Sequence, residues 1–249
     1  MAHTLVIQSH RTPLPAHWME RTIDSVETWA ALRHFDYCFL GDELFDVLPQ
    51  DLLIKTRKQP VVASDLARLK AMKSALSDGY QTVIWCDADF LIFLPEKFDL
   101  PPDDFGLGRE IWIQRDSRSG RPHAYIKVHN AFLFFRKGNA FLDFFTDSAE
   151  RLIRKHDGPF VPQFLGPKFL TAIHNIVQCP VVESAGMLSP LVIKDVLNGS
   201  GPFLDLFLEH ALHPIAAVNL CGSLTANGEI SDEEVSGVID ILLSGISPF

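Results

Sequence analysis

Residues 82–93 read TVIWCDADFLIF, an apolar run that carries two carboxylates, Asp87 and Asp89. The β-branched and aromatic residues before the acids favour a buried strand over 82–86. The two acids then stand at the end of that strand, where removing them from water is unfavourable unless a cation compensates their charge.

The spacing of the two carboxylates predicts a metal site. Residues i and i+2 of an extended segment point to one face, so both side chains can face one ion. Hard oxygen ligands favour Mg²⁺ or Mn²⁺, and such an ion carrying a phosphorylated ligand would compensate the two charges. A chance surface turn is the alternative for so short a motif, and the flanking apolar strand argues against it.

The rest of the chain alternates apolar segments with segments of helical periodicity. We expect strands over 3–9, 36–40, 82–86, 110–115, 124–128, 130–136, 181–183 and 215–219. We expect helices over 16–33, 62–77, 139–155, 166–177 and 232–243, a short helix within 43–56, and an N-cap at Ser64. This order predicts an α/β fold in which helices cover both faces of a mixed central sheet, as a single domain over 1–249.

Composition narrows the class of protein. The 249 residues carry a formal net charge of −9, which argues against a nucleic-acid partner held through phosphates. The four cysteines lie far apart, so we expect reduced thiols and neither disulfides nor a zinc site. We find no signal peptide and no apolar run of about 18 residues, and therefore expect a cytoplasmic protein without a transmembrane segment.

A second polar pair lies in the predicted helix before the central strand. Asp65 and Arg68 are three positions apart, so they share one helix face. Arg68 would orient a carboxylate or a phosphate, and Asp65 a ribose or sugar hydroxyl. An ordinary surface ion pair is the alternative.

Several motifs together resemble a known family. Residues 63–68 (ASDLAR), 79–80 (GY) and 85–89 (WCDAD) are similar to metal-dependent glycosyltransferases of the GT-A fold. The resemblance is to the group with a sugar-binding DxD region, which includes mannosyltransferases and capsular polysaccharide and toxin glycosyltransferases. Residues 165–171 (LGPKFLT) resemble that group's Gly-Pro helix start, and residues 130–139 (NAFLFFRKGN) resemble its Asn-containing strand.

The resemblance implies roles for particular residues. It implies Asp89 as a direct ligand of Mn²⁺ or Mg²⁺, and Asp87 as a contact to the metal through water or to the ribose. A histidine near the C-terminus is often a third ligand in such enzymes, and His213 is the best match. The remaining candidates would bind the donor: Gln8 at a pyrimidine edge, Arg11 at phosphate and Asn130 at a sugar hydroxyl.

The predicted function is transfer of a hexose from a UDP- or GDP-sugar to a hydroxyl acceptor, such as a polysaccharide or a glycolipid. Residues 1–130 would bind the nucleotide sugar and residues 131–249 the acceptor, with peripheral membrane contact where the acceptor is lipid-linked. The resemblance favours retention of configuration. No catalytic base is identified, and Asp116, Glu183 and Asp195 are carboxylates without an assigned role. The loop 116–123 is a candidate lid over the donor.

Two other classes of function stay open. A non-catalytic sugar- or protein-binding module would keep the fold without the activity. A nucleotidyltransferase would also bind a nucleotide and a metal. It needs a Gly-rich basic loop after the first strand, however, and residues 9–15 contain no glycine.

Overall fold

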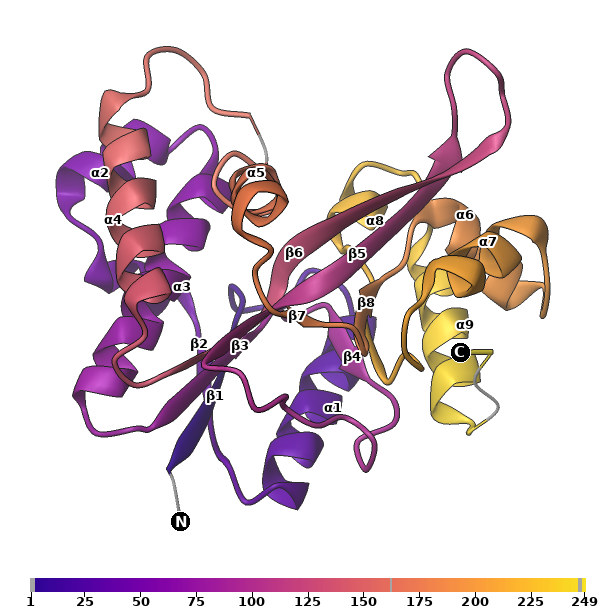
Figure 1. Ribbon diagram of the computed structural model, residues 1–249, viewed down its shortest axis with the longest axis horizontal. Helices are drawn as coiled ribbons and strands as arrows, with labels where there is room; N and C mark the ends of the chain where they lie inside the picture. The colour runs from indigo at the N-terminus through magenta and orange to yellow at the C-terminus, as the bar shows by residue number, and fades with distance from the viewer. Residues whose placement is uncertain (1–2, 162, 246–247) are drawn as a thin grey trace.

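The computed structural model describes residues 3–161, 163–245 and 248–249. Within them, a six-stranded sheet has the order β2 (Asp36–Leu40), β1 (Thr4–Ser9), β3 (Thr82–Cys86), β6 (Pro122–Arg136), β5 (Phe105–Arg115) and β7 (Val181–Val182) (Figure 1). β1 is parallel to β2 and β3, whereas β6 is antiparallel to β3 and β5. A smaller sheet joins β4 (Phe90–Ile92), β9 (Ala217–Asn219) and β8 (Ala185–Met187). The predicted α/β fold with a mixed central sheet is confirmed.

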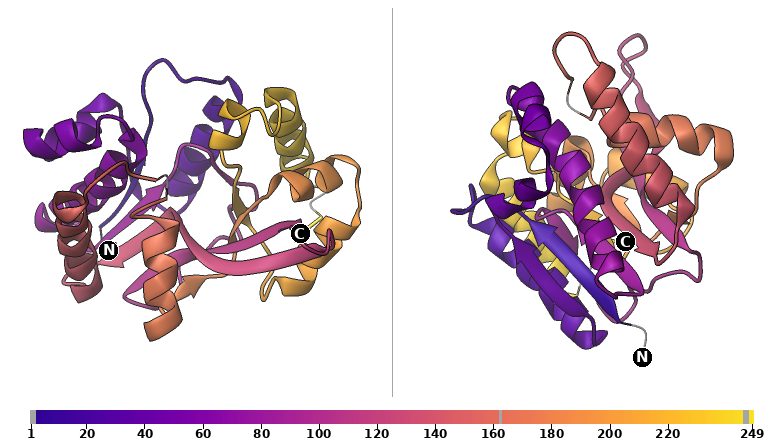
Figure 2. Two further views of the ribbon diagram at one scale, coloured as in Figure 1. Left: turned by 90° about the horizontal axis from the view of Figure 1, so that it is seen from above. Right: turned by 90° about the vertical axis from the view of Figure 1, so that its left-hand side faces the viewer.

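Helices cover both faces of the large sheet. Figure 2 (right) shows β1 and β2 between α1 on one side and α3 on the other. The helical segments are α1 (Trp18–Leu32), η1 (Asp42–Val47), α2 (Gln50–Thr56), α3 (Pro60–Ser77), α4 (Ala140–Lys155), α5 (Pro167–Val177), α6 (Pro190–Leu197), α7 (Pro202–His210), α8 (Ser223–Ala226) and α9 (Asp232–Leu243). None of the helices in the described residues is both long and apolar enough to cross a membrane.

β3 is buried on both faces, which explains its continuous apolar sequence. Val83 and Trp85 pack into one core cluster with α3 and α4, whereas Ile84 and Cys86 pack into another with α1. The chain leaves β3 at Asp87, directly after Cys86. This places the two predicted acids at the carboxyl end of the central strand, where ligands of α/β sheets bind.

Residues 122–136 form one strand, β6, where the sequence predicts two. The pairing with β5 jumps from Gly108↔His129 to Leu107↔Leu133, so residues 130–132 bulge out of the ladder. Gly108 is required at this bulge, because a Cβ there would lie 2.1 Å from Cε1 of His129. Beyond the bulge β6 pairs with β5 on one side and β3 on the other, and the main-chain N–H of Asp87 donates to the carbonyl of Ala131 (2.8 Å).

The predicted lid is the tip of the β5–β6 hairpin. In Figure 1 this tip projects away from the central sheet. The whole outer part of β6, from Pro122 to Val128, separates the tip from the bulge beside Asp87. The expectation that residues 116–123 close over the donor stays a prediction, and it would require the hairpin to bend. Asp116 stabilises the tip itself, since its Oδ1 accepts from the main chain of Arg118 (3.1 Å) and Ser119 (2.7 Å).

Three other expectations need correction. α3 begins at Pro60 with Gln59 as its N-cap, so Ser64 lies inside the helix. β5 begins at Phe105, five residues before the strand predicted over 110–115. The sequence analysis missed α6, α7, α8 and β8, which lie in the C-terminal third.

Candidate functional site

A buried cluster of polar side chains lies at the carboxyl end of β3. We call Asp65, Arg68, Asp87 and Asn130 the arginine network, because Arg68 contacts the other three. Its Nη1 lies 2.9 Å from Oδ1 of Asp87 and donates to the main-chain carbonyl of Asn130 (2.8 Å). Its Nη2 lies 3.3 Å from Oδ1 of Asp65. The Asn130 amide in turn donates to Asp65 (2.8 Å). The structure thus joins residues predicted from three separate motifs.

Local structure explains why these side chains meet. Asp65 and Arg68 share the face of α3 that packs against the sheet, and both are nearly fully buried. The bulge in β6 carries Asn130 toward that face. Gly166, which precedes α5, lets the chain pass close above the amide, because a Cβ at this position would lie 2.7 Å from Nδ2 of Asn130. The Gly-Pro start of α5 therefore closes the network from above.

Asp87 has further support from Trp85, Gln8 and Tyr37, of which only Gln8 was predicted as a site residue. The indole N–H of Trp85 donates to its Oδ1 (2.7 Å), and the guanidinium of Arg68 lies 5.0 Å from the centre of the same ring. Gln8 donates to the main-chain carbonyl of Asp87 (3.1 Å) and accepts from the hydroxyl of Tyr37 (3.0 Å). Among the described residues, no hydrogen bond uses Oδ2 of Asp87, so this atom is available to a ligand.

Asp89 lies in a different environment, which we call the Asp89 cradle: Asp89, Asn219 and Gly222. The Asn219 amide donates to Oδ1 (2.7 Å), and the main-chain N–H of Gly222 donates to Oδ2 (2.6 Å). Oδ1 of Asn219 accepts from the N–H of Cys221 (2.9 Å), which fixes the orientation of the amide. On the other side, Thr22 of α1 donates to the carbonyl of Ala88 (2.6 Å).

The pKa values in the site reflect burial and the uneven distribution of charge. Burial raises the pKa of Asp65 to about 6, although Arg68 and Asn130 favour its ionised form. Burial and then the neighbouring Asp87 raise the pKa of Asp89, and only neutral donors oppose this shift. Burial lowers the pKa of His129 to about 4, so this ring is neutral at physiological pH. Arg68 thus pairs with two of the three carboxylates, Asp65 and Asp87, whereas Asp89 has only neutral donors.

The residues present fit a divalent cation in part. Asp87 and Asp89 offer hard oxygen ligands and an excess of negative charge, which suits Mg²⁺ or Mn²⁺. Both oxygens of Asp89 already accept hydrogen bonds, however, so binding would have to share or displace these donors. Residues 3–161, 163–245 and 248–249 contain no group of three or more His, Cys, Asp or Glu side chains that could hold a metal. The metal site stays a prediction.

The third predicted ligand, His213, lies elsewhere. β4 and β9 pair with Phe90 opposite Asn219 and Ile92 opposite Ala217. The Asp89 cradle is therefore at one end of the small sheet. His213, which precedes β9, lines a cavity at the other end. The short strand β9 separates the histidine from Asp89, so the assignment of His213 as a ligand beside Asp89 is wrong.

The two N-terminal candidates have different outcomes. Gln8 is fully buried, and its amide is hydrogen-bonded to the main-chain carbonyl of Asp87 and to the hydroxyl of Tyr37. The structure therefore does not support a contact to a nucleotide base. Arg11 is exposed in the loop after β1, and its phosphate contact stays a prediction. The division into a donor half and an acceptor half near residue 130 also stays a prediction, and that boundary falls inside β6.

The three carboxylates left without a role all have structural partners. Asp116 stabilises the hairpin tip, and Glu183 forms an ion pair with Arg109 (2.5 Å). Asp195 is buried and accepts from the main chain of Phe203 (2.7 Å) and Leu204 (3.0 Å) at the start of α7. None of the three lies in the arginine network or the Asp89 cradle.

Comparison with solved structures gives this fold a known counterpart. A glycosyltransferase involved in glycosylation of the major capsid of PBCV-1 matches with a TM-score of 0.50 and 12% identity, over 93% of this chain and 97% of that chain. This chain has a GT-A-like fold. Weaker matches are the galactosyltransferase LgtC (TM-score 0.43, 12% identity, 94% of this chain and 95% of that chain) and GlyE of Streptococcus pneumoniae (TM-score 0.45, 10% identity, 99% and 64%). No protein-family model and no curated protein matches the sequence.

Several site residues could not be found from sequence alone. Tyr37, Asn219 and Gly222 reach the site from segments far from the DxD stretch. The only local signal is that Asn219 ends a short apolar strand, as Asp87 directly follows one. Thr22 gives no signal, since one buried threonine in a helix is common.

Proposed function

We propose that the chain is a glycosyltransferase that takes a sugar from a nucleotide-diphosphate sugar, UDP- or GDP-linked, and moves it to a hydroxyl acceptor. The observation that carries this proposal is the arginine network. Arg68 is buried, and it holds Asp87 at the carboxyl end of β3 with one carboxylate oxygen directed to no other described residue. A buried ion pair of this kind is weak support for stability, and an oriented, partly exposed carboxylate at a sheet edge is typical of a ligand site.

Each residue has a role in the proposal. Asp87 and Asp89 would hold a divalent cation, and such an ion would neutralise charge that develops on the departing nucleoside diphosphate. Arg68 and Trp85 hold Asp87 in one orientation. Asn219 and the N–H of Gly222 orient Asp89. Asp65 and Asn130 hold Arg68 in place from the side away from the ligand. The base, the sugar, the acceptor and the stereochemistry are left open.

A non-catalytic sugar- or nucleotide-binding protein is the second candidate, and one observation favours it. Both oxygens of Asp89 accept hydrogen bonds within the protein, and no third acidic, histidine or cysteine ligand is present among the described residues. A chain that has lost its metal could retain this arrangement for structural reasons alone. Metal-dependent turnover of a sugar nucleotide separates the two candidates.

Calorimetric titration of UDP and GDP tests the proposal. The titrations are run with Mn²⁺ and with EDTA on the wild type, on Asp89→Ala and on Asp147→Ala, a matched control on the exposed face of α4. We expect binding of one nucleotide that needs Mn²⁺, is lost in Asp89→Ala and is unchanged in Asp147→Ala. Binding that is equal in all three proteins, or absent from the wild type with Mn²⁺ present, would overturn the proposed donor site.

A further inference from the structure

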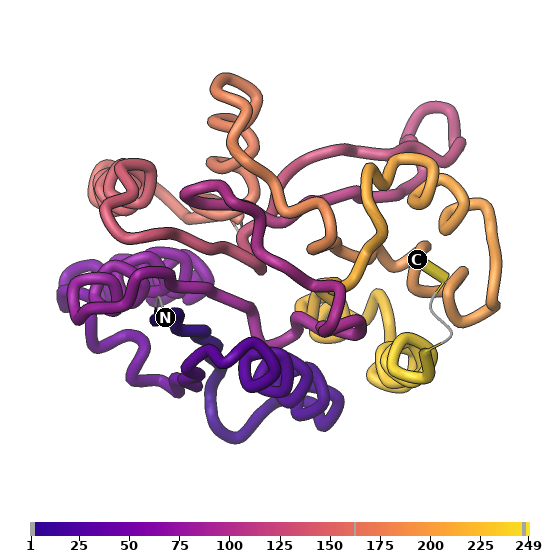
Figure 3. Tube along the Cα trace, turned by 60° about the horizontal axis from the view of Figure 1, so that its bottom comes forward, coloured from indigo at the N-terminus to yellow at the C-terminus, as the bar shows by residue number. Residues whose placement is uncertain are grey.

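The outer part of the β5–β6 hairpin carries an excess of positive charge in an acidic protein. We call residues 110–127 the hairpin arm. They contain four Lys or Arg and two Asp or Glu, whereas the whole chain contains 22 and 31. In Figure 1 and Figure 3 the tip of the arm lies at the outer edge of the molecule. The arm therefore presents to solvent a charge opposite in sign to the net charge of the chain.

Both acids of the arm have partners within it. Glu110 is buried and forms an ion pair with Lys127 (3.2 Å). Asp116 accepts hydrogen bonds from the main chain of the tip. We call Arg118 and Arg121 the tip arginines: both are exposed, and among the described residues their side chains form no hydrogen bond or ion pair. Two guanidinium groups are therefore available to an anionic ligand, and guanidinium matches the geometry of a carboxylate.

One face of the arm is rich in hydrogen-bonding groups. Trp112 pairs with Tyr125, and Gln114 pairs with His123, so the four side chains lie on one face of the hairpin. We call these four residues the hairpin face. The rings of His123 and Tyr125 meet edge to face, with centres 4.5 Å apart. None of the four is fully buried, and within the described part of the chain none of their side chains forms a hydrogen bond. The face thus offers an indole N–H, a phenol, an imidazole and an amide beside aromatic surface.

The opposite face of the arm is packed against the protein. Ile111 and Ile113 are buried in the core cluster that α6, α7 and α9 form. The guanidinium of Arg115 donates to the carbonyl of Gly120 (3.1 Å) and lies 5.0 Å from the centre of the Phe203 ring in α7. Because these contacts hold the arm against the helices, the hairpin face has a defined orientation before any ligand binds.

The inner end of the arm reaches the proposed donor site. β6 continues from Lys127 to Asn130, which belongs to the arginine network. Burial, and then the charges of Asp89, Glu110 and Asp87, raise the pKa of the Cys221 thiol, so Glu110 lies in the same neighbourhood as the Asp89 cradle. A ligand that follows the arm inward from the tip would therefore arrive beside the donor site.

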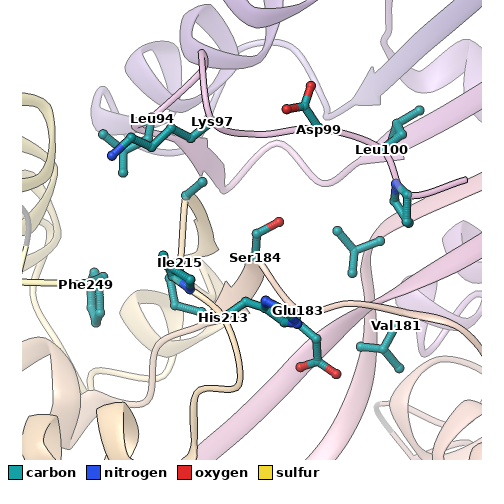
Figure 4. A pocket seen from close by; sticks show the side chains of 14 residues that line it. Leu94, Lys97, Asp99, Leu100, Val181, Glu183, Ser184, His213, Ile215 and Phe249 are labelled. Carbon is teal, nitrogen blue, oxygen red and sulfur yellow. The ribbon is translucent and has the colours of Figure 1, made fainter.

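The cavity beside His213 has no comparable set of groups. Its volume is about 460 Å³, and its walls are mainly apolar. In Figure 4 the Lys97 side chain points away from Ser184 and His213. Glu183 in its wall is paired with Arg109 (2.5 Å). Positive charge and free hydrogen-bonding groups thus gather on the hairpin arm, and not in this cavity.

We propose that the hairpin arm binds an acidic saccharide chain, with carboxylates at the tip arginines and hydroxyls along the hairpin face. Sugar rings combine hydroxyl groups with apolar C–H surface, which complements aromatic side chains that carry one polar atom each. From Glu110 to Gln114 the strand extends roughly 13 Å, which is longer than one sugar ring. The role of this chain as the acceptor rests on the proposed function, whereas its binding to the arm does not.

Calorimetric titration with three probes, at low ionic strength and without nucleotide or metal, tests the proposal. Tetragalacturonate is the acidic saccharide, cellotetraose is a neutral saccharide of the same length, and tetraglutamate is a peptide with the same net charge and no sugar. We expect tetragalacturonate to bind about tenfold more tightly than either of the others. Equal binding of tetraglutamate would overturn the assignment of a saccharide, and equal binding of cellotetraose would overturn the role of charge. No binding of tetragalacturonate would overturn the proposal as a whole.

Variants with matched controls locate the binding. Arg118→Gln combined with Arg121→Gln should weaken tetragalacturonate binding about tenfold. Arg57→Gln combined with Arg151→Gln changes the net charge equally at two exposed arginines on other elements, and should leave the affinity unchanged. Equal affinities in the two double variants would contradict the site.

Two further variants test the hairpin face and separate the arm from the donor site. Tyr125→Ala should weaken binding about fivefold, whereas Tyr80→Ala, at the tyrosine after α3, should not. Thermal unfolding checks that both variants fold. Asp89→Ala should bind tetragalacturonate as the wild type does, and a loss of binding there would place the saccharide in the donor site and contradict the proposal. If neither UDP nor GDP binds the wild type, the proposed donor site fails, and the tetragalacturonate titration still decides the role of the arm.

Discussion

Asp87 and Asp89 are two residues apart, yet they are held in opposite ways. The arginine network surrounds Asp87 with a full positive charge from Arg68 and an indole N–H from Trp85. The Asp89 cradle surrounds Asp89 with an amide and a main-chain N–H, both neutral. Asp87 is therefore compensated within the protein, while the charge of Asp89 is not, and burial raises its pKa.

The difference shows how one motif can provide two functions. A carboxylate with a built-in cation keeps its charge and its orientation without a ligand. A carboxylate with neutral partners gains most when an external cation arrives. On this basis Asp87 is a preorganised contact, and Asp89 is the residue whose state responds to a metal. The four predictions below test the two halves of this comparison.

Loss of the arginine should have the largest effect on stability. Arg68→Met leaves Asp65 and Asp87 without their cation in a buried setting, so we expect the free energy of unfolding to fall by about 3–5 kcal/mol. Arg154→Met is the control: its ion pair with Glu150 is at the surface and contributes under about 1 kcal/mol. Urea denaturation of the two variants measures the difference. An equal loss of unfolding free energy in the two variants would show that the ion pairs of Arg68 contribute no more than an ordinary surface ion pair.

Acid should lower the free energy of unfolding through protonation of His129, a residue next to Asn130 in β6. His129 is buried in the bulge that presents Asn130, its Nδ1 accepts from the N–H of Ala131 (3.1 Å) and its Nε2 faces the carbonyl of Ala185 (3.1 Å). Its pKa is lowered to about 4 from 6.5. Below pH 6.5 the unfolded chain binds this proton first, so stability falls as the pH drops toward 4, by about 3 kcal/mol in all.

The histidine is isolated by comparing variants over that pH range. Asp65, with its raised pKa, acts in the opposite sense, because its ionisation weakens the fold as the pH rises from about 4 to 6. His129→Gln should remove the loss that His129 causes, whereas His17→Gln, at an exposed site before α1, should keep it. Urea denaturation between pH 4.5 and 7 is the measurement. Identical pH profiles in the two variants would refute this role of His129.

A divalent cation should stabilise the protein through Asp89. At a Mn²⁺ concentration about 100 times its Kd, we expect a gain of roughly 2.7 kcal/mol in the free energy of unfolding. The gain should shrink as the pH falls, because the raised pKa of Asp89 means that protons compete with the metal for its carboxylate. Thermal unfolding with Mn²⁺ and with EDTA measures it. The same gain in Asp89→Ala would place the metal elsewhere.

The smallest effect should come from one hydrogen bond to Asp87. Trp85→Phe removes the indole N–H that donates to this carboxylate, and a hydrogen bond to a charged group contributes about 1.5–3 kcal/mol. Trp29→Phe is the matched control, because its N–H donates to the main-chain carbonyl of Phe98, away from the site. Both variants should lose some stability, but only Trp85→Phe should bind nucleotide more weakly. Titration calorimetry of both separates the two effects.

Much of the fold could be predicted because its signals are local. The apolar run before Asp87, the periodicity of α1, α3 and α4 and the Asp65–Arg68 spacing each determine a structure within a few turns or one strand. Four elements of the C-terminal third, α6, α7, α8 and β8, could not be predicted in this way. β8 has three residues, α8 has four, and α6 and α7 have no more than nine. Tertiary packing, and not periodicity, defines elements of this length.

The candidate site could also be predicted in part from local sequence motifs. Asp65, Arg68, Asp87 and Asn130 were found from their own motifs, and the structure brings them together. Asn219 could not be found, because its role depends on the pairing of β4 with β9, in which Phe90 lies opposite Asn219, 129 residues later in the chain. The same pairing places His213 at the end of the small sheet away from Asp89, because β9 lies between the two residues.

Turnover of sugar nucleotides tests the central claim most directly. A panel of UDP- and GDP-sugars is incubated with Mn²⁺ and the wild type, Asp87→Ala or Asp147→Ala, and release of the nucleoside diphosphate is measured. We predict that the wild type and Asp147→Ala release it from one donor, and that Asp87→Ala and EDTA abolish the release. Equal release by Asp87→Ala, or none by the wild type with any donor, would contradict the assignment of this sheet edge as the donor site of a glycosyltransferase.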